Sequence, residues 1–319
     1  MRILQDDEAI PHDLAGAVAA LGNFDGVHLG HRAVVARAAE IARARHAPLA
    51  VVTFEPHPRS FFQPSAAPFR LTPLEAKARI LSDQGVGALF ALRFGAALAG
   101  MGPADFVARV LSDRLGLSCA VTGYNFRFGR GREGDAAGLA ALGKKHNVAV
   151  ESVPPQVSAD GEACSSSRIR EYLAAGDVRG AAGLLGREFE IEGIVATGAR
   201  LGNTIGFPTA NLALGEYVRP ALGVYAVRCA VEDGSAPVWR AGAANIGRRP
   251  TVGGSEERLE AHLFDFSADL YGKRLRVALI DHLRPERKFD GLDSLKAQIA
   301  EDCARARAIL GTTLSPAAG

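Results

Sequence analysis

The decapeptide GNFDGVHLGH, residues 22–31, holds two histidines three positions apart in a glycine-rich frame. Imidazoles can donate hydrogen bonds to phosphate oxygens, and glycines let a backbone approach a ligand closely. His31 falls where a strand should pass into a helix, whose N-terminal N–H groups favour an anion. His28 and His31 are therefore predicted to stabilise charge on a phosphate during transfer. Zinc binding is a weaker interpretation, because HxxH alone supplies too few ligands and neither His46 nor His57 is regularly spaced from it.

A second segment, CSSSRIREYLAAGD at 164–177, starts a predicted helix with hydroxyls and continues with arginines. Serine hydroxyls and helix N–H groups cradle phosphate, and arginine binds it through its forked guanidinium. Taken alone, the segment is more simply a serine N-cap with arginines in solvent. Together with the histidine pair it favours phosphate binding by Ser166, Ser167, Arg168 and Arg170.

A third segment, TGARLGNTIGFPTANL at 197–212, is a turn-rich loop that leads into a strand. Its glycines would free backbone N–H groups for phosphates, while Thr209 and Asn211 offer oxygen ligands suited to Mg²⁺. By itself the pattern is more often a plain turn.

The segment RLEAHLFDF, residues 258–266, places Glu260, His262 and Phe264 on one face of a predicted strand. A carboxylate there could take a proton from a hydroxyl nucleophile. The alternative is a solvated glutamate on an edge strand.

The elements that must position these residues follow two different sequence patterns, one before and one after residue 187. Up to residue 186, continuous apolar runs alternate with helical patterns, which indicates a doubly wound parallel sheet. Its strands are predicted within 17–24, 48–56, 87–94, 119–126 and 148–155. From residue 187, strands separated by Gly/Pro turns predict a small antiparallel β-barrel, followed by a terminal helix at 291–310. The predicted domains are therefore 1–186 and 187–319.

Composition limits the classes of function. The chain has 319 residues, 48% of them hydrophobic, and a formal net charge of +2. Such a charge creates no global field for nucleic acid, and no apolar run is long enough to span a membrane. The four cysteines form no CxxC pair, which favours reduced thiols and a cytoplasmic location. The sequence leaves the oligomeric state open and is compatible with a homo-oligomer.

The N-terminal motifs resemble a known family. HLGH and SSSRIR resemble the HxGH and ISSTxIR signatures of nucleotidylyltransferases, with Ser167 where threonine is usual. Together with TFEPHP and GYNFRFGRGREGD, the longer string GNFDGVHLGH resembles the FMN adenylyltransferase module of bacterial bifunctional FAD synthetases. The resemblance implies nucleotide binding by Gly22, Phe24, Gly26 and Gly30, and a flavin side formed by Phe54, Pro56, His57, Phe62 and Asn125.

The C-terminal motifs GFPTAN, GVYAV, ANIGRRPTVGG and LEAHLFDF resemble riboflavin kinase domains. The resemblance implies that Glu260 is the catalytic base and that Thr209 and Asn211 hold Mg²⁺–ATP. It further implies phosphate binding by Gly198, Arg200 and Gly206, and flavin binding by Asn245, Arg249 and Thr251.

The resemblance covers roughly residues 16–310 and implies a two-step enzyme. ATP would phosphorylate riboflavin to FMN, and a second ATP would adenylylate FMN to FAD with release of pyrophosphate. The expected partners are therefore ATP and flavins, with Mg²⁺. Two alternatives stay open at this point: a nucleotidylyltransferase acting on a pantetheine, nicotinate or glycerol phosphate, and a flavin or RNA sensor with a spent active site.

Overall fold

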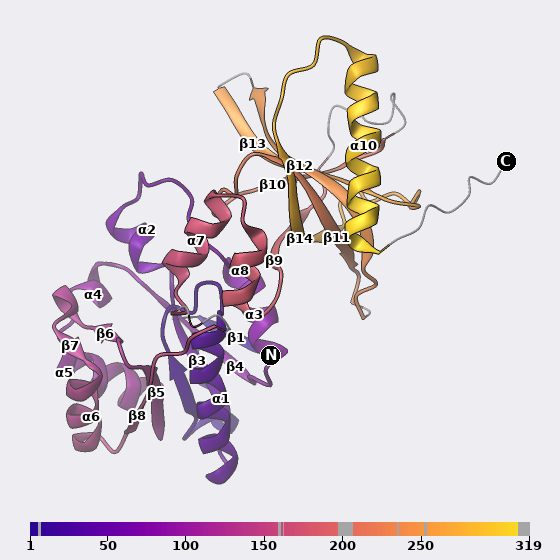
Figure 1. Ribbon diagram of the computed structural model, residues 1–319. Coiled ribbons are helices and arrows are strands. Elements are labelled where there is room, and N and C mark those ends of the chain that lie inside the picture. The colour runs from indigo at the N-terminus through magenta and orange to yellow at the C-terminus, as the bar shows by residue number, and fades with distance from the viewer. Residues whose placement is uncertain are drawn as a thin grey trace. The chain divides into compact units, whose positions relative to one another are not determined.

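The computed structural model describes residues 1–5, 8–158, 161, 163–196, 207–234, 236–251 and 254–311. They form two compact units (Figure 1). The first comprises Met1–Ala67 and Thr72–Ser166, and the second comprises Pro68–Leu71 and Ser167–Gly319. Within the described ranges, no helix combines the length and apolar character needed to cross a membrane.

The first unit is built on a six-stranded sheet in the order β1-β4-β3-β2-β5-β8, and every pairing is parallel. Its strands are β1 (Arg2–Gln5), β2 (Val18–Leu21), β3 (Leu49–Glu55), β4 (Ala88–Arg93), β5 (Cys119–Gly123) and β8 (Ala149–Val153). Five of them lie in the predicted apolar runs. The edge strand β1 was missed, because only Leu4 of its four residues is buried and the stretch carries no apolar run.

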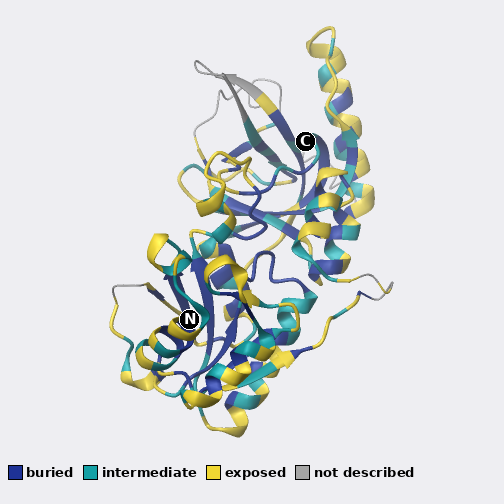
Figure 2. Ribbon diagram, turned by 90° about the vertical axis from the view of Figure 1, so that its left-hand side faces the viewer, coloured by how far each residue is buried: buried dark blue, intermediate teal, exposed yellow. Residues whose placement is uncertain are grey.

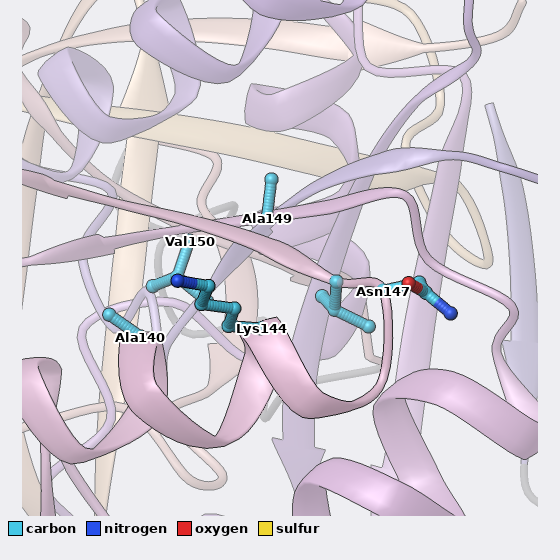
Figure 3. Close-up of a pocket in the computed structure, with 6 residues that line it drawn as sticks. Ala140, Lys144, Asn147, Ala149 and Val150 are labelled. Atoms are coloured by element: carbon cyan, nitrogen blue, oxygen red, sulfur yellow. The ribbon is translucent and has the colours of Figure 1, made fainter.

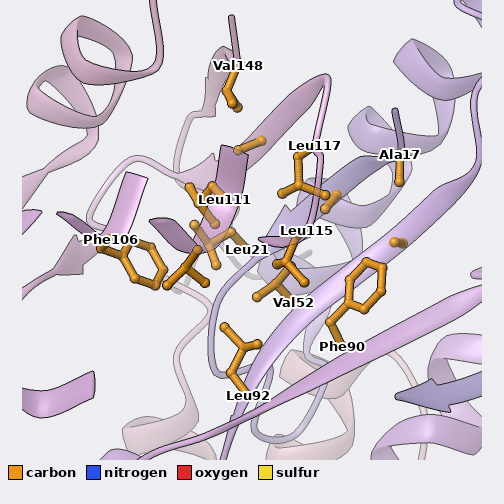
Figure 4. Close-up of a cluster of buried hydrophobic side chains, with 14 of the residues drawn as sticks. Ala17, Leu21, Val52, Phe90, Leu92, Phe106, Leu111, Leu115, Leu117 and Val148 are labelled. Atoms are coloured by element: carbon orange, nitrogen blue, oxygen red, sulfur yellow. The ribbon is translucent and has the colours of Figure 1, made fainter. Parts of the chain in front are cut away.

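Helices cover both faces of this sheet. On one face, α1 (Leu29–Ala44) and α3 (Leu74–Ser82) pack on Val18, Ala20 and Val51. On the other, a helical segment of π-type turns (Phe106–Arg114) and α6 (Ala136–Lys145) pack on Ala19, Leu21 and Val52, part of the cluster in Figure 4. Successive residues of β2 thus enter opposite cores, which explains why the strands are apolar throughout. The expected doubly wound fold is confirmed.

Shorter elements complete the first unit. They are the helices α2 (Pro58–Phe62), α4 (Ala96–Ala99) and α5 (Pro103–Asp105), the single turns His12–Leu14 and Arg130–Arg132, and the paired strands β6 (Arg127–Phe128) and β7 (Gly134–Asp135). Asp135 caps α6 by accepting a hydrogen bond from the Gly138 N–H at 2.8 Å.

The strand order reverses at β2. The chain proceeds from β2 to β3 and β4 on one side, and returns to β5 and β8 on the other. Ligands of open α/β sheets bind beside such a switch point, at the carboxyl ends of the strands. The loop 22–28 follows β2 and residues 124–126 follow β5, so these predicted site segments leave the sheet at its ligand-binding edge.

The second unit contains an antiparallel six-stranded sheet in the order β10-β13-β12-β11-β14-β9. Its strands are β9 (Phe189–Ile194), β10 (Ala210–Ala213), β11 (Gly223–Glu232), β12 (Arg240–Thr251), β13 (Gly254–Leu263) and β14 (Arg274–Pro285). A bridge between Ala196 and Asn211 connects the two ends of the sheet. This closure confirms the predicted small barrel, and Figure 2 shows its strands as largely buried.

Among the described residues, the helices of the second unit are α7 (Ser166–Ala174), α8 (Val178–Leu185) and α10 (Leu292–Leu310). The helix α10 packs through Ala306 and Leu310 on Val224 and Ala226 of β11, as predicted. The shorter helices α7 and α8 precede the barrel. Apart from Ser166 they are grouped with the barrel rather than with the parallel sheet. The compact units divide between Ser166 and Ser167, and the predicted boundary between residues 186 and 187 stays a prediction.

Candidate active sites

Two stacked imidazoles occupy the N-terminus of α1. The ring centroids of His28 and His31 lie 3.6 Å apart with 18° between the planes, and the edge of the Phe24 ring contacts His31. His28 is the N-cap, and its Nδ1 accepts a hydrogen bond from the backbone N–H of His31 at 3.3 Å. A neutral imidazole that accepts at Nδ1 carries its proton on Nε2. The capping bond therefore makes His28 Nε2–H a donor. We call His28, His31 and the loop 22–31 the histidine site.

The loop before the histidines has an unusual backbone. Phe24, Gly26 and Val27 have φ values of 48°, 90° and 43°. Positive φ is costly for a β-branched residue such as Val27, and it persists only where the surroundings enforce it. Phe24 and Val27 are both buried, which supplies that constraint.

Polar contacts hold the same loop. The carboxylate of the buried Asp25 accepts from the backbone N–H of Thr72 at 3.0 Å, and the Gly26 N–H donates to the Thr72 hydroxyl at 2.8 Å. The hydroxyl of Ser166 donates to the backbone carbonyl of Asp25 at 2.8 Å. Ser166, predicted to bind phosphate, is thus attached directly to the loop that carries the histidines.

Gly30 allows the histidine pair to close. A Cβ at this position would lie 3.0 Å from His28 Cε1 and 3.1 Å from His28 Nδ1. At Gly22, an added Cβ would make an ordinary contact with the Phe24 ring at 3.4 Å. Gly30 is therefore the glycine that makes room for a side chain of the site, the His28 ring.

The remaining members of the serine–arginine motif belong to the second unit. Ser167 is exposed, and Arg168 pairs with Glu171 at 2.9 Å and stacks over the Tyr172 ring. Arg170 donates through Nε to the Phe69 carbonyl at 2.7 Å and lies over the Phe69 ring. The structure therefore groups Ser166 with the histidine site and the other three residues with unit two.

Aromatic rings line the predicted flavin side in the first unit. The exposed Phe62 contacts Phe61 and Phe94, with ring centroids 5.2 and 5.8 Å away. Phe94 also contacts the buried Phe54 at 6.1 Å. Sequence motifs identified Phe54 and Phe62 but missed Phe61 and Phe94. Phe94 follows β4, so only the fold brings it to the rings of 54–62.

The other predicted flavin-side residues lie at the carboxyl ends of β3 and β5. Pro56 is exposed directly after β3, and His57 caps α2 by accepting at Nδ1 from the Arg59 N–H at 3.1 Å. Asn125 is exposed just after β5. A ligand above this edge of the sheet can therefore reach each of them.

In the barrel, Glu260 stands in a row with two asparagines. The ladder register places Asn211 of β10 opposite Glu260 of β13, and Glu260 opposite Asn245 of β12. Directly opposite residues share a face of a sheet with Cβ atoms roughly 4.5–5.5 Å apart. We call Asn211, Glu260 and Asn245 the Glu260 row. It collects a carboxylate and two amides from three segments that are distant in sequence.

The segment before Asn211 is held beside this row. His262, two residues after Glu260 on the same strand, lies 2.8 Å through Nδ1 from the Pro208 carbonyl, and its ring contacts Phe207. Asn211 Nδ2 donates to the Thr209 carbonyl at 3.3 Å. His262 therefore fixes the chain that carries Thr209.

Glu286 also lies at this end of the barrel, and sequence motifs did not single it out. A Cβ on Gly247 would overlap Glu286 Oε1 and lie 2.7 Å from Asn245 Nδ2. Gly247 therefore leaves space for a carboxylate and an amide at the same spot.

Five predicted residues lie outside the described side chains. Gly198, Arg200 and Gly206 lie outside the described residues, and Arg249 and Thr251 are described only as backbone of β12. Within the described ranges, no group of three or more His, Cys, Asp or Glu side chains is arranged to hold a metal ion.

A cavity of about 350 Å³ lies between α6 and the start of β8, lined by Lys144, Asn147 and small apolar residues (Figure 3). It opens at the amino end of β8, whereas the site segments follow the carboxyl ends of their strands. It therefore belongs to neither site.

Comparisons with known proteins match both parts of the chain. A family model described as FAD synthetase matches residues 10–168, and one described as riboflavin kinase matches residues 185–310. The chain is 42% identical over 298 residues to the bifunctional riboflavin kinase/FMN adenylyltransferase of Escherichia coli K12, covering 93% of this chain and 94% of that protein. It is 43% identical over 295 residues to the protein of the same name from Pseudomonas fluorescens, covering 92% of this chain and 93% of the relative.

A solved structure is similar over the whole length as well. The crystal structure of a protein named Macrolide-efflux Protein from Streptococcus pneumoniae matches with a TM-score of 0.81 and 30% identity, covering 95% of this chain and 97% of that one. The family models favour flavin over the other phosphate acceptors considered from sequence. With both models matched in order and curated relatives aligned almost end to end, the chain belongs to the family of bifunctional riboflavin kinase/FMN adenylyltransferases.

Proposed function

We propose that the chain forms FMN at the Glu260 row and converts FMN to FAD at the histidine site. Both activities are those of the family. The observation that carries the assignment is the ladder register, which gathers a carboxylate and two amides around one position of the barrel. No comparable carboxylate row is needed in the first unit, where the nucleophile is already an anion.

In the kinase step, the riboflavin 5′-hydroxyl attacks the γ-phosphorus of ATP and ADP leaves. Glu260 accepts the hydroxyl proton as the O–P bond forms. Asn245, opposite Glu260, orients the flavin side of the site. Phosphoryl transfer depends mainly on positioning, which a rigid ladder of three strands supplies.

Magnesium fits the donor set of the barrel. The Thr209 hydroxyl and the Asn211 amide oxygen are hard ligands, and Mg²⁺ usually completes its shell with waters and substrate phosphates. Asn211 is buried and Thr209 half-buried, so both are placed by the fold rather than by the ion. When bound, the ion neutralises charge on the phosphates.

In the adenylyl transfer, an FMN phosphate oxygen attacks the α-phosphorus of ATP. The new P–O bond replaces the bond to pyrophosphate, which leaves. His28 Nε2–H and the His31 ring stabilise charge on the phosphates at the N-terminus of α1. Ser166 supports the loop from which they act. The assignment of Ser167, Arg168 and Arg170 to the leaving pyrophosphate stays a prediction.

The isoalloxazine ring requires an apolar surface, and the exposed edge formed by Phe61, Phe62 and Phe94 offers one. Offset or edge-to-face aromatic contacts contribute about 0.5–1.5 kcal/mol each beyond area burial. We therefore place the flavin of the second reaction against these rings.

The cellular setting follows from the same proposal. The substrates are small molecules, and near-zero net charge argues against nucleic acid as a partner. All four cysteines are free of disulfides, which supports the predicted cytoplasmic location.

The decisive experiment separates the flavins made from riboflavin, ATP and Mg²⁺. In the Glu260→Gln variant we expect no FMN from riboflavin, because the amide cannot accept the proton, while supplied FMN is still converted to FAD. The matched control is Glu301→Gln, the same change at an exposed position of α10. An arm with a chelator in place of Mg²⁺ should abolish FMN formation.

Retention of riboflavin phosphorylation in Glu260→Gln would refute the base assignment. Loss of both activities in a folded variant would refute the separation into two sites.

A further inference from the structure

A fully buried lysine lies beneath the histidine site. Lys77 is on α3, and its side chain has 0% exposure. Its Nζ donates to the Thr53 hydroxyl at 3.1 Å and to Glu55 Oε1 at 3.0 Å. Thr53 is also fully buried, and both partners lie near the carboxyl end of β3. No motif of the sequence drew attention to this lysine.

The network continues from Thr53 into the loop of the histidine site. The Thr53 hydroxyl donates to the backbone carbonyl of Asn23 at 3.1 Å. An ammonium group has donors only, so the hydroxyl must accept from Lys77 and direct its own proton elsewhere. The charge of Lys77 thereby fixes the direction of the bond that reaches Asn23.

Lys77 of α3 and Thr72, which precedes the helix, therefore hold the loop at two places. Lys77 acts on Asn23 through Thr53, and Thr72 contacts Asp25 and Gly26 directly. Between these anchors lies Phe24, with its positive φ and its ring against His31. Displacement of the Asn23 carbonyl would consequently move Phe24 and the histidine ring it contacts.

Folding stability alone does not explain why Lys77 is buried as an ion pair. Removing an ammonium group from water is costly, and a well-packed apolar replacement of a buried ion pair is often neutral or stabilising. What a charged, directional network adds is a defined geometry for the backbone it anchors.

We propose that Lys77 is a positioning residue for adenylyl transfer, which acts through Thr53 and Asn23 to hold Phe24 and the His28–His31 pair in their reactive geometry. This inference rests on the proposed role of the histidine site. Because Lys77 has no exposed surface, it acts on the reaction without contacting substrate.

The first test is Lys77→Met, which keeps the length of the side chain and removes the charge. We expect kcat for FMN to FAD to fall about 10- to 100-fold, since misplacement of reacting groups by about 1 Å costs on the order of 10²-fold. The KM for ATP should change less than threefold. Riboflavin phosphorylation by the same preparation serves as an internal control, and Lys145→Met, at an exposed lysine of α6, as the matched variant.

The second test uses Thr53→Val, which replaces the hydroxyl by a methyl group, and Thr53→Ser, which keeps the hydroxyl and loses the methyl group. Thr53→Val should lower kcat for adenylyl transfer about 5- to 20-fold, whereas Thr53→Ser should keep kcat within about threefold of wild type. In a double-mutant cycle, Lys77→Met with Thr53→Val should lose no more kcat than Lys77→Met alone, because both changes break one path.

Multiplicative losses in the double variant would overturn the proposal, as would Lys77→Met with unchanged kcat. Recovery of kcat by adding Glu55→Gln to Lys77→Met would overturn it too, because the loss would then reflect only an uncompensated buried carboxylate. If Lys77→Met does not fold, the comparison of kcat between Thr53→Val and Thr53→Ser tests the proposal. If His28→Ala loses FMN adenylylation while the Lys77 and Thr53 variants keep it, only this inference is refuted. If His28→Ala itself keeps FMN adenylylation, the proposed role of the histidine site is refuted.

Discussion

At the scale of single residues, protonation decides what each site can do. His28 Nδ1 accepts the capping hydrogen bond from the His31 N–H, so the proton of the neutral imidazole lies on Nε2 without any ligand being needed to direct it there. Glu260 is half-buried between two amides, which orient it without supplying a competing charge. These features suit the proposed roles, which are donation to phosphate at the histidine site and acceptance of a proton at Glu260.

We expect His28→Ala and His31→Ala each to reduce FMN adenylylation by about 10²–10³-fold, the usual cost of losing a preorganised donor to developing charge. Riboflavin phosphorylation should be unaffected, so FMN should accumulate. The measurement is the ratio of FMN to FAD formed from riboflavin. His12→Ala, at an exposed histidine of the same unit, provides the matched control. Normal FAD synthesis by the double variant would contradict the phosphate role.

At the scale of elements, strand register assembles the Glu260 row, and helix capping orients the histidine site. Apart from the edge strand β1, the strands of the parallel sheet were predicted from the sequence because their apolar runs enter a core on at least one face. The register was not readable, since an antiparallel pair can slide without changing its composition. It is the register that places Asn211 and Asn245 on either side of Glu260.

The strand β14 carries a histidine whose titration should be visible in stability. Burial lowers the pKa of His282 below its usual 6.5, despite the opposing charge of Asp281. Its ring packs on Tyr225, with centroids 4.8 Å apart, and leaves no room for a Cβ on Gly223. The unfolded chain therefore binds this proton more readily than the folded barrel.

Between pH 6.5 and the lower folded pKa, the unfolded state binds more protons, so stability falls as pH falls. We expect the melting temperature of the barrel to drop on acidification below about pH 6.5, and to drop less in His282→Gln. The sole tryptophan, Trp239, lies in the second unit, so its fluorescence reports this melting specifically. Equal pH dependence in both proteins would exclude His282 as the cause.

At the scale of the whole molecule, the chain forms two compact units, and a different family model matches most of each. Leu259 of β13 and Leu89 of β4 are each fully buried in their own unit. The chain does not divide at a single point, because residues Pro68–Leu71 belong to the second unit. There the backbone of Arg70 forms an isolated parallel β-bridge with Tyr217. The sequence did not predict that these four residues belong to the second unit, since so short a segment shows no periodic pattern.

Truncating one core should inactivate one activity first on heating. Leu259→Ala should cost about 2–5 kcal/mol in the barrel and lower the temperature at which riboflavin phosphorylation is lost. At about 2–4 °C per kcal/mol, the shift is measurable by Trp239 fluorescence and by residual activity. Leu89→Ala should instead lower the temperature at which FMN adenylylation is lost. If each variant loses both activities at one temperature, the units do not unfold separately.

The sequence by itself determined the chemistry and the two classes of fold. Residue types are local, and the apolar runs and turn residues record which faces each element buries. The histidine pair, the hydroxyl–arginine helix and Glu260 were therefore found without coordinates. Only the tertiary structure decided how the residues meet: the stacking of His28 on His31, the Glu260 row, Phe94 beside Phe62, and Lys77 beneath the loop. These contacts join segments far apart in the chain, and their energies depend on geometry that no local pattern encodes.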